Sequence, residues 1–405
     1  MDFIYKTINV MMGKVIYIGL AMGSSIYFTR MLHAEGRGDL AMLSTVAGTL
    51  VQLFNFGLHS SHIYYISQDR EKVNLAEGNI ISVLFFSLGI SVAIYYILIS
   101  FPNVVKLSPY LIVMTLGVFV TNLFMLLYVN LLLPNGGVSK YSIYQILPML
   151  FTLGLVMLSS NWRQVDVNLV ATMMLVANLL TMLISMKDNL WYKPQFSLEF
   201  LKMALSYGLK SFTACLFSYL LLRSDVFMLN YFCTKEEVGY YSVAANLADS
   251  VYIVSASIFT ILFTKLSSCK TMTDRLALMS RSGKYVVPLL VLMAGMMEIV
   301  AEYLVCLLYG EEFLQSVPLL RGLIIASIAI ALAGGAFNFF ASENRFSESI
   351  IITVFAFSIN VLLNYLMIPH YFAFGAVLSS VISYMLTAIL IYVCMYKYVK
   401  TYRTV

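Results

Sequence analysis

An arginine and an aspartate, Arg223 and Asp225, stand two residues apart inside the apolar stretch SYLLLRSDVFMLNYF, residues 218–232. Two residues of an α-helix correspond to about 200° of rotation, so the two side chains do not face each other on a regular turn. Each charge therefore needs a partner on another helix or a water-filled cavity. A guanidinium binds phosphate through two parallel hydrogen bonds, so Arg223 is a candidate for binding an anion.

The composition predicts an integral membrane protein. Of the 405 residues, 60% are hydrophobic and 11% are charged, whereas a soluble domain carries about 25% charged residues. A soluble protein with so few charges could not cover its surface with polar groups. A chain of this length must cross the membrane many times, and we expect it to be all-α.

Twelve apolar segments are long enough to cross the hydrocarbon, which takes about 20 residues of helix. Charges, prolines and glycines separate them, and the first apolar run is expected to be a membrane span and not a cleaved signal. The predicted spans are residues 9–31, 39–66, 79–101, 109–133, 138–160, 166–187, 204–231, 238–264, 285–309, 315–340, 347–368 and 372–396.

The distribution of Lys and Arg predicts the orientation, because cytoplasmic segments carry an excess of them. With the N-terminus inside, seventeen of the 25 Lys and Arg residues lie in inner segments and five in outer ones. The remaining three, Lys14, Arg223 and Arg321, lie within spans. We therefore expect both termini to be cytoplasmic. The net charge of +5 reflects this asymmetry, so it does not indicate nucleic acid binding.

The two halves of the chain resemble each other. FTRMLHAEGRGDLAMLSTVAGTL, residues 28–50, follows the first span, and LNYFCTKEEVGYYSVAANLADSV, residues 229–251, follows the seventh. Gly38 aligns with Gly239, and each opens a helix rich in small residues. Such repeats build transporters with a site between the halves. We predict two six-helix lobes, residues 1–190 and 204–405, joined by a cytoplasmic linker, residues 191–203.

Three stretches resemble the polysaccharide flippase family of the MOP superfamily, the Wzx-type exporters. They are GRGDLAMLSTVAGTLVQLFNFGLHSSHIYYIS (36–67), RSDVFMLNYFCTKEEVGYYSVAANLADSV (223–251) and LLYGEEFLQSVPLLRGLI (307–324). The second is similar to the family's Arg-x-Asp followed by Val-Gly-x-Tyr-Ser-x-Ala, and the third to its Tyr-Gly-x-x-Phe and following Leu-Arg. The resemblance covers the whole chain in order.

The resemblance implies a MATE-like fold of twelve or fourteen helices in two lobes and alternating access by rocking of the lobes. It also implies a cargo of undecaprenyl-pyrophosphate-linked oligosaccharide repeat units, moved from the cytoplasmic to the outer leaflet of a bacterial inner membrane. Expected partners are this lipid-linked oligosaccharide, membrane lipids, and the polymerase and chain-length proteins of a surface polysaccharide pathway such as O-antigen synthesis.

Ionisable residues inside spans usually face the protein interior and mark function. Because the implied cargo carries a diphosphate, the candidate cargo-binding or gating residues are Lys14, Arg30, Arg223 and Asp225. Lys14 and Arg30 have the alternative of being interfacial anchors near the ends of the first span.

Other buried charges have different expected roles. Asp249 and Glu298 lie nearer to mid-membrane, where each is a candidate for coupling to a proton or sodium ion or, alternatively, a polar contact between helices. Glu302 and Arg321, near the outer ends of consecutive spans, are predicted to form a structural ion pair.

No residue pattern predicts catalysis, a metal site or a cofactor. The five cysteines and four histidines show no metal-binding spacing, and no P-loop predicts ATP hydrolysis. A MATE-like, cation-coupled drug exporter is the main alternative function, but the first span lacks an acidic residue and carries Lys14, which favours anionic cargo. A polysaccharide polymerase is the second alternative, disfavoured because no long outer loop carries acids and a histidine.

Overall fold

The computed structural model describes residues 2–134, 137–188, 194–269 and 271–403, and within these ranges the chain forms helices and no strands. The α-helices are α1 (Asp2–Phe54), α2 (Leu58–Gln68), α3 (Val73–Ser100), α4 (Pro109–Val129), α5 (Val138–Ser159), α6 (Val167–Asp188), α7 (Leu198–Phe232), α8 (Lys235–Ser268), α9 (Met272–Tyr309), α10 (Ser316–Ser342) and α11 (Phe346–Arg403). Short 3₁₀ segments are η1 (Arg70–Lys72), η2 (Asn130–Leu132) and η3 (Glu311–Gln315).

The two longest helices, α1 and α11, each consist of two helices joined at a single non-helical residue. His33 has φ 56° and ψ −175° in α1, and Phe372 has φ 52° and ψ −136° in α11. A positive φ is uncommon for residues other than glycine, so both residues mark sharp changes of direction. Each long helix therefore supplies two membrane crossings.

The helices confirm the predicted twelve-span architecture. Eight helices of the described chain are long and apolar enough to cross a membrane, and α1 from Ile16 with α2, bent by 47°, forms a ninth candidate. Counting both halves of α1 and of α11 adds two crossings, and the 34-residue α8 adds the twelfth. The protein is therefore a multi-pass, all-helical membrane protein.

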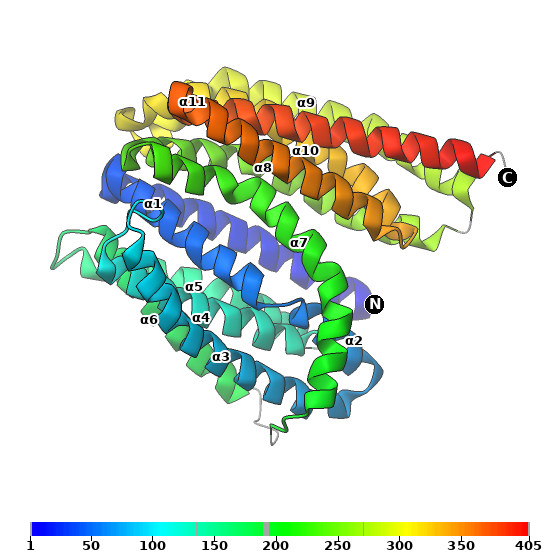
Figure 1. The fold of residues 1–405 in the computed structure, drawn as a ribbon, viewed down its shortest axis with the longest axis horizontal. Coiled ribbons are helices and arrows are strands. Elements are labelled where there is room, and N and C mark those ends of the chain that lie inside the picture. Colours follow the sequence, from blue (N-terminus) through cyan, green and yellow to red (C-terminus); the bar gives the residue numbers. More distant parts are fainter. Residues whose placement is uncertain (1, 135–136, 189–193, 270, 404–405) are drawn as a thin grey trace. The chain divides into compact units, whose positions relative to one another are not determined.

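The chain forms two compact units, Met1–Leu216 and Phe217–Val405. Unit one contains α1 to α6 and the first part of α7, and unit two contains the rest of α7 and α8 to α11 (Figure 1). An 18-residue apolar stretch is 61% buried in α4 and 67% buried in α10, more than in α3, α5, α6, α7, α9 or α11. These are the fourth and the tenth crossings, which are equivalent in a six-span repeat.

Small residues let α10 pack closely against its neighbours in unit two. Ala326, Ala329, Ala333 and Ala336 are buried in one cluster with residues of α7, α9 and α11. Their spacing of three or four residues places them on one helical face. In a membrane, where apolar burial does not drive helix association, such small faces allow close van der Waals contact.

The first part of α7 belongs to unit one because it packs tightly on α2. A Cβ placed on Gly57, which has φ +72°, would lie 2.2 Å from the carbonyl oxygen of Gly208. Tyr64 and Tyr207 stack with ring centroids 4.4 Å apart. The division between the units therefore falls inside α7. The predicted linker, residues 191–203, lies partly outside the described residues and stays a prediction.

Exposed tyrosines mark the membrane-facing segment of α9. Tyr285 is 74% exposed and Tyr303 is 70% exposed, and exposed apolar side chains between them include Val291, Leu292 and Ile299. The two tyrosines are 18 positions apart, which corresponds to about 27 Å of helix, close to the hydrocarbon thickness of about 30 Å. Tyrosines gather at both membrane interfaces, so the first turns of α9, before Tyr285, extend beyond the hydrocarbon.

Candidate functional site

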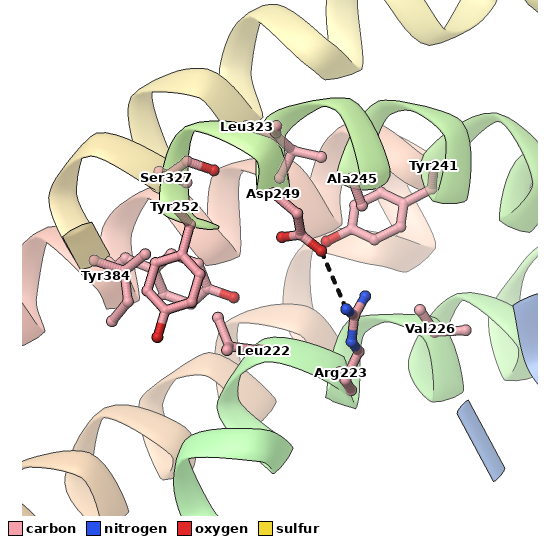
Figure 2. Close-up of a pocket in the computed structure, with 13 residues that line it drawn as sticks. Leu222, Arg223, Val226, Tyr241, Ala245, Asp249, Tyr252, Leu323, Ser327 and Tyr384 are labelled. Atoms are coloured by element: carbon pink, nitrogen blue, oxygen red, sulfur yellow. Dashed lines mark hydrogen bonds and ion pairs between the residues drawn. The ribbon is translucent and has the colours of Figure 1, made fainter. Parts of the chain in front are cut away.

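A pocket in unit two brings together two of the charges predicted from the sequence. Its walls come from α7, α8, α10 and α11, and its polar lining includes Arg223, Asp249, Tyr252, Ser327 and Tyr384. Figure 2 shows Arg223 on α7 pointing across to Asp249 on α8. The pocket is therefore the candidate site.

The spacing of residues on α8 creates one wall of this pocket. Tyr241, Ala245, Ala248, Asp249 and Tyr252 line it, and their positions follow the period of three to four residues that defines a helix face. The alanines leave space between the two tyrosines. Thr234 caps the start of this helix, because its side chain accepts a hydrogen bond from the backbone N–H of Glu237 at 3.5 Å.

Arg223 and Asp249 form an ion pair at 3.1 Å between Nη2 and Oδ2. Both side chains are half-buried, at 36% and 34% exposure. A guanidinium has five N–H donors in a fixed fork, and within the described residues a hydrogen bond to Asp249 uses one of them. The pocket therefore holds a cation that has a carboxylate partner and further donors for a second anionic group.

Asp225 lies in a separate, closed network. Its side chain is 1% exposed and accepts hydrogen bonds from Tyr241 Oη at 2.6 Å, Ser380 Oγ at 2.6 Å and Asn364 Nδ2 at 2.5 Å. A buried carboxylate is costly unless its oxygens are hydrogen-bonded, and these three donors supply that compensation. Arg223 and Asp225 thus have different partners, as their spacing predicts.

Further amides and hydroxyls extend the Asp225 network. Asn360 accepts hydrogen bonds from Ser224 at 2.8 Å and Asn364 at 3.0 Å, and donates to Ser383 at 3.1 Å. Asn360 and Asn364 come from the half of α11 before Phe372, and Ser380 and Ser383 from the half after it. The network therefore ties α7 and α8 to both halves of α11.

The expected ion pair between Glu302 and Arg321 is wrong, because Arg321 pairs with Glu298. The Nε–Oε1 distance is 3.1 Å, and both side chains are about half exposed, whereas Glu302 is exposed. Glu298 and Glu302 are one turn apart on α9, about 6 Å along its axis. The relative position of α9 and α10 along their axes decides which acid Arg321 meets.

The remaining predicted residues lie in α1. Arg30 is exposed, three residues before the change of direction at His33. Lys14 belongs to the same helix, but its side chain lies outside the described part of the structure. Both belong to unit one, and their roles in cargo binding stay predictions.

Several residues of the Asp225 network were missed from the sequence. Tyr241, Asn360, Asn364 and Ser380 carry no charge, so a search for ionisable residues passes over them. One signal was present: Asn360 and Asn364 stand four residues apart in the apolar stretch SINVLLNYL. Within the described residues, no group of three or more His, Cys, Asp or Glu side chains is placed to hold a metal ion.

A comparison with protein families identifies the chain. The profile described as polysaccharide biosynthesis protein matches residues 4–268, which is about two thirds of the sequence. The chain belongs to the polysaccharide biosynthesis protein family. The matched segment includes Arg30, Arg223, Asp225 and Asp249, whereas Glu298 and Arg321 lie beyond it. A sequence search of curated proteins finds no match.

This member of the family shares its fold with solved transporters. The inward closed conformation of the lipid II flippase MurJ aligns with a TM-score of 0.82 at 12% identity, covering 97% of this chain and 87% of that one. An inward-facing MATE multidrug resistance transporter of the MOP superfamily aligns with a TM-score of 0.76 at 14% identity, covering 95% of both chains. A MOP superfamily transporter from Pyrococcus furiosus aligns with a TM-score of 0.67 at 15% identity, covering 97% and 94%. The predicted MATE-like fold is therefore confirmed.

Proposed function

We propose that this protein is a flippase that moves undecaprenyl-pyrophosphate-linked oligosaccharide repeat units from the cytoplasmic to the outer leaflet of a bacterial inner membrane. Membership of the polysaccharide biosynthesis family supports the cargo class. The fold of MurJ and of the MATE transporters supports a membrane transport role for the chain. The single observation that carries the proposal at the residue level is the Arg223–Asp249 pair in the pocket of unit two.

In this proposal Arg223 binds the diphosphate of the cargo, and Asp249 is its partner when cargo is absent. The two anions compete for one guanidinium, so cargo binding releases Asp249. A released carboxylate in a half-buried pocket is then available for a proton or a sodium ion, which would couple transport to an ion gradient. Arg30 and Lys14, in the first helix of unit one, are separate candidates for contact with the anionic cargo.

The alternative is a cation-coupled drug exporter, which the likeness to MATE transporters keeps open. A pocket for cationic drugs needs carboxylates without basic partners. Asp249 has a basic partner, Arg223, and the predicted first span has no acidic residue. Both features favour an anionic cargo over a cationic one.

The test combines deletion with complementation by Arg223 variants. Loss of the protein should remove a surface polysaccharide, leave lipid-linked repeat units on the inner leaflet, and leave sensitivity to cationic drugs unchanged. Arg223→Ala should restore no export at normal protein abundance, and Arg223→Lys should restore part of it, because charge remains without the bidentate geometry.

Arg321→Ala is the matched control, since Arg321 is also paired with an acid but is more exposed, at 50%, and it should restore export. A deletion strain with normal surface polymer and raised drug sensitivity would overturn the proposal. Export by Arg223→Ala at the wild-type level would show that Arg223 does not bind the cargo.

A further inference from the structure

Unit one contains buried polar atoms without partners near the turn between α2 and α3. Both ring nitrogens of His62, Asn74 Oδ1 and Glu77 Oε2 are buried and have no hydrogen-bond partner. His62 is 0% exposed and Glu77 is 6% exposed. A buried polar atom without a partner is unfavourable, so such atoms on both sides of one turn point to a ligand that supplies missing contacts.

These residues lie at similar distances along their helices from the turn that joins α2 to α3. His62 is six residues before the end of α2 at Gln68, and Glu77 is four residues after the start of α3 at Val73. Those intervals correspond to about 9 Å and about 6 Å of helix above the turn. Asn74 and Glu77 are three residues apart and share a face of α3.

The same short segment, residues 195–200, packs against both helices. The ring of Phe200 stacks on His62, with centroids 6.3 Å apart and planes 9° apart. The backbone N–H of Gln195 donates to the carbonyl oxygen of Asn74 at 3.0 Å. A Cβ on Gly78 would lie 2.3 Å from the carbonyl oxygen of Gln195, so α3 lies directly against this segment. His62, Asn74 and Gly78 therefore all adjoin the segment 195–200, and Glu77 precedes Gly78 in the chain.

The chemistry of His62, Asn74 and Glu77 fits a water molecule and a proton. A water can donate to Asn74 Oδ1 and to a Glu77 oxygen while it accepts from the one N–H of a neutral His62. An unpaired carboxylate in an apolar region is neutral in practice, because protonation avoids the cost of burying its charge. Two ionisable ligands fall short of a metal site, and within the described chain no set of three such side chains occurs.

Neighbouring ionisable groups have their own surroundings. His59 uses both ring nitrogens, in contacts with Asn55 at 2.8 Å and Ser60 at 3.0 Å. Lys72 lies 3.8 Å from Asp69 and over the ring of Tyr65. Other titratable side chains on the adjoining elements include Tyr64, Arg70, Glu71, Tyr128, Glu199, Lys202 and Tyr207, while Tyr95 and Tyr96 lie toward the far end of α3.

We propose that His62, Asn74 and Glu77 form a water-filled proton-binding site at the turn end of the α2–α3 pair. The proton comes from bulk water and binds one carboxylate oxygen of Glu77, and no other covalent bond changes. The water connects the resulting acid to His62 and Asn74. The site lies in unit one and requires neither cargo nor the Arg223 pocket, so it stands apart from the proposed function.

Infrared spectroscopy of the full chain in membranes, titrated with pH, tests the site. The wild-type protein should show a protonated carboxyl band that disappears as pH rises, and Glu77→Gln should lack this band. Glu199→Gln, an exposed acid on α7 one residue before Phe200, is the matched control and should keep it. His62→Gln should shift the titration midpoint by about one pH unit, because the partner of the acid changes.

Two results would overturn the proposal. One is a set of titrating carboxyl bands that is the same in Glu77→Gln and in the wild type. The other is removal of the band by sodium replacing potassium at constant ionic strength, which would indicate a cation site. If Glu77→Gln does not accumulate in membranes, the His62→Gln variant is the test. A titration midpoint of the carboxyl band that is the same in His62→Gln and in the wild type contradicts the proposal.

Discussion

At the scale of single residues, the protein treats two neighbouring charges differently. Arg223 faces a half-buried pocket with one acidic partner, and Asp225 is enclosed by donors from α8 and from both halves of α11. A half-buried pair can exchange partners, whereas an enclosed network holds helices in place. We therefore infer a structural role for Asp225 and a cargo role for Arg223.

The structural role of Asp225 predicts an order of stability among variants. Asp225→Ala leaves the donors of Tyr241, Ser380 and Asn364 without an acceptor, which should lower the free energy of unfolding by about 3 kcal/mol or more. Asp225→Asn keeps one acceptor oxygen but turns an N–H₂ group toward a donor, so the loss should be smaller, about 1–2 kcal/mol. Thermal unfolding of the purified protein in detergent measures both.

Ser358→Ala is the control for this series, because Ser358 lies two residues from Asn360 on α11 but is exposed and bonds to its own helix. It should unfold like the wild type. Equal stability of Asp225→Ala and Asp225→Asn would contradict the hydrogen-bonding role.

Predictions about single residues succeeded where a residue's partners depend on spacing within one helix. They failed where the partners depend on how two helices are placed relative to each other. The spacing of Arg223 and Asp225 was enough to separate their partners. The partner of Arg321 depends on the offset between α9 and α10, which no residue type encodes. The neutral members of the Asp225 network become recognisable only after the fold brings α7, α8 and α11 together.

At the scale of elements, the contact between α2 and α7 depends on two glycines. A Cβ on Gly57 would lie 2.2 Å from the oxygen of Gly208, and a Cβ on Gly208 would lie 2.8 Å from the carbonyl oxygens of Phe56 and Gly57. Backbone atoms cannot move aside as the end of a flexible side chain can. The two helices must therefore separate if either glycine gains a side chain.

We expect Gly57→Ala to destabilise the protein by about 2 kcal/mol or more, since it adds a clash to an unfavourable positive φ. Gly208→Ala should destabilise it through the clash alone. Gly23→Ala in α1 is the matched control, because nothing lies within 4 Å of a Cβ there, and alanine favours the helix by about 1 kcal/mol. Protein abundance in membranes and the unfolding midpoint in detergent compare the three. A Gly57→Ala protein as stable as Gly23→Ala would show that α2 and α7 do not pack this closely.

The existence of the elements was predictable, but their connections were not. Apolar length alone locates the crossings, because the hydrocarbon sets a minimum of about 20 residues. The sequence suggested a loop between the spans at 9–31 and 39–66, whereas the chain turns at one residue, His33, within a continuous helical run. The same occurs at Phe372, three residues after Pro369. The hydropathy of the sequence does not reveal a turn made by a single residue with an unusual backbone conformation.

At the scale of the whole molecule, charge asymmetry predicts the orientation of the chain, and exposed aromatic residues mark the ends of a span. Lys and Arg are retained on the cytoplasmic side during insertion, and tyrosines settle at the two interfaces. On α9 the residues before Tyr285 include Arg275, Arg281 and Lys284, and the segment from Tyr285 to Tyr303 has the length of the hydrocarbon. The basic end of α9 should therefore lie in the cytoplasm, as should both termini.

Single cysteines in a variant stripped of the five native cysteines test this orientation with a membrane-impermeant thiol reagent. Trp162, in the turn between α5 and α6, is 85% exposed and belongs to a predicted outer segment, so Trp162→Cys should react in intact cells. Ser268, at the exposed end of α8, lies between the basic residues Lys265 and Arg275, so Ser268→Cys should react only after the membrane is permeabilised. Both side chains are accessible to water, so a difference in labelling reports the side of the membrane and not burial. Reaction of Ser268→Cys in intact cells would indicate that the orientation is the reverse of the predicted one, or that the number of crossings before Ser268 differs by an odd number. A twelve-crossing chain with cytoplasmic termini would then be excluded.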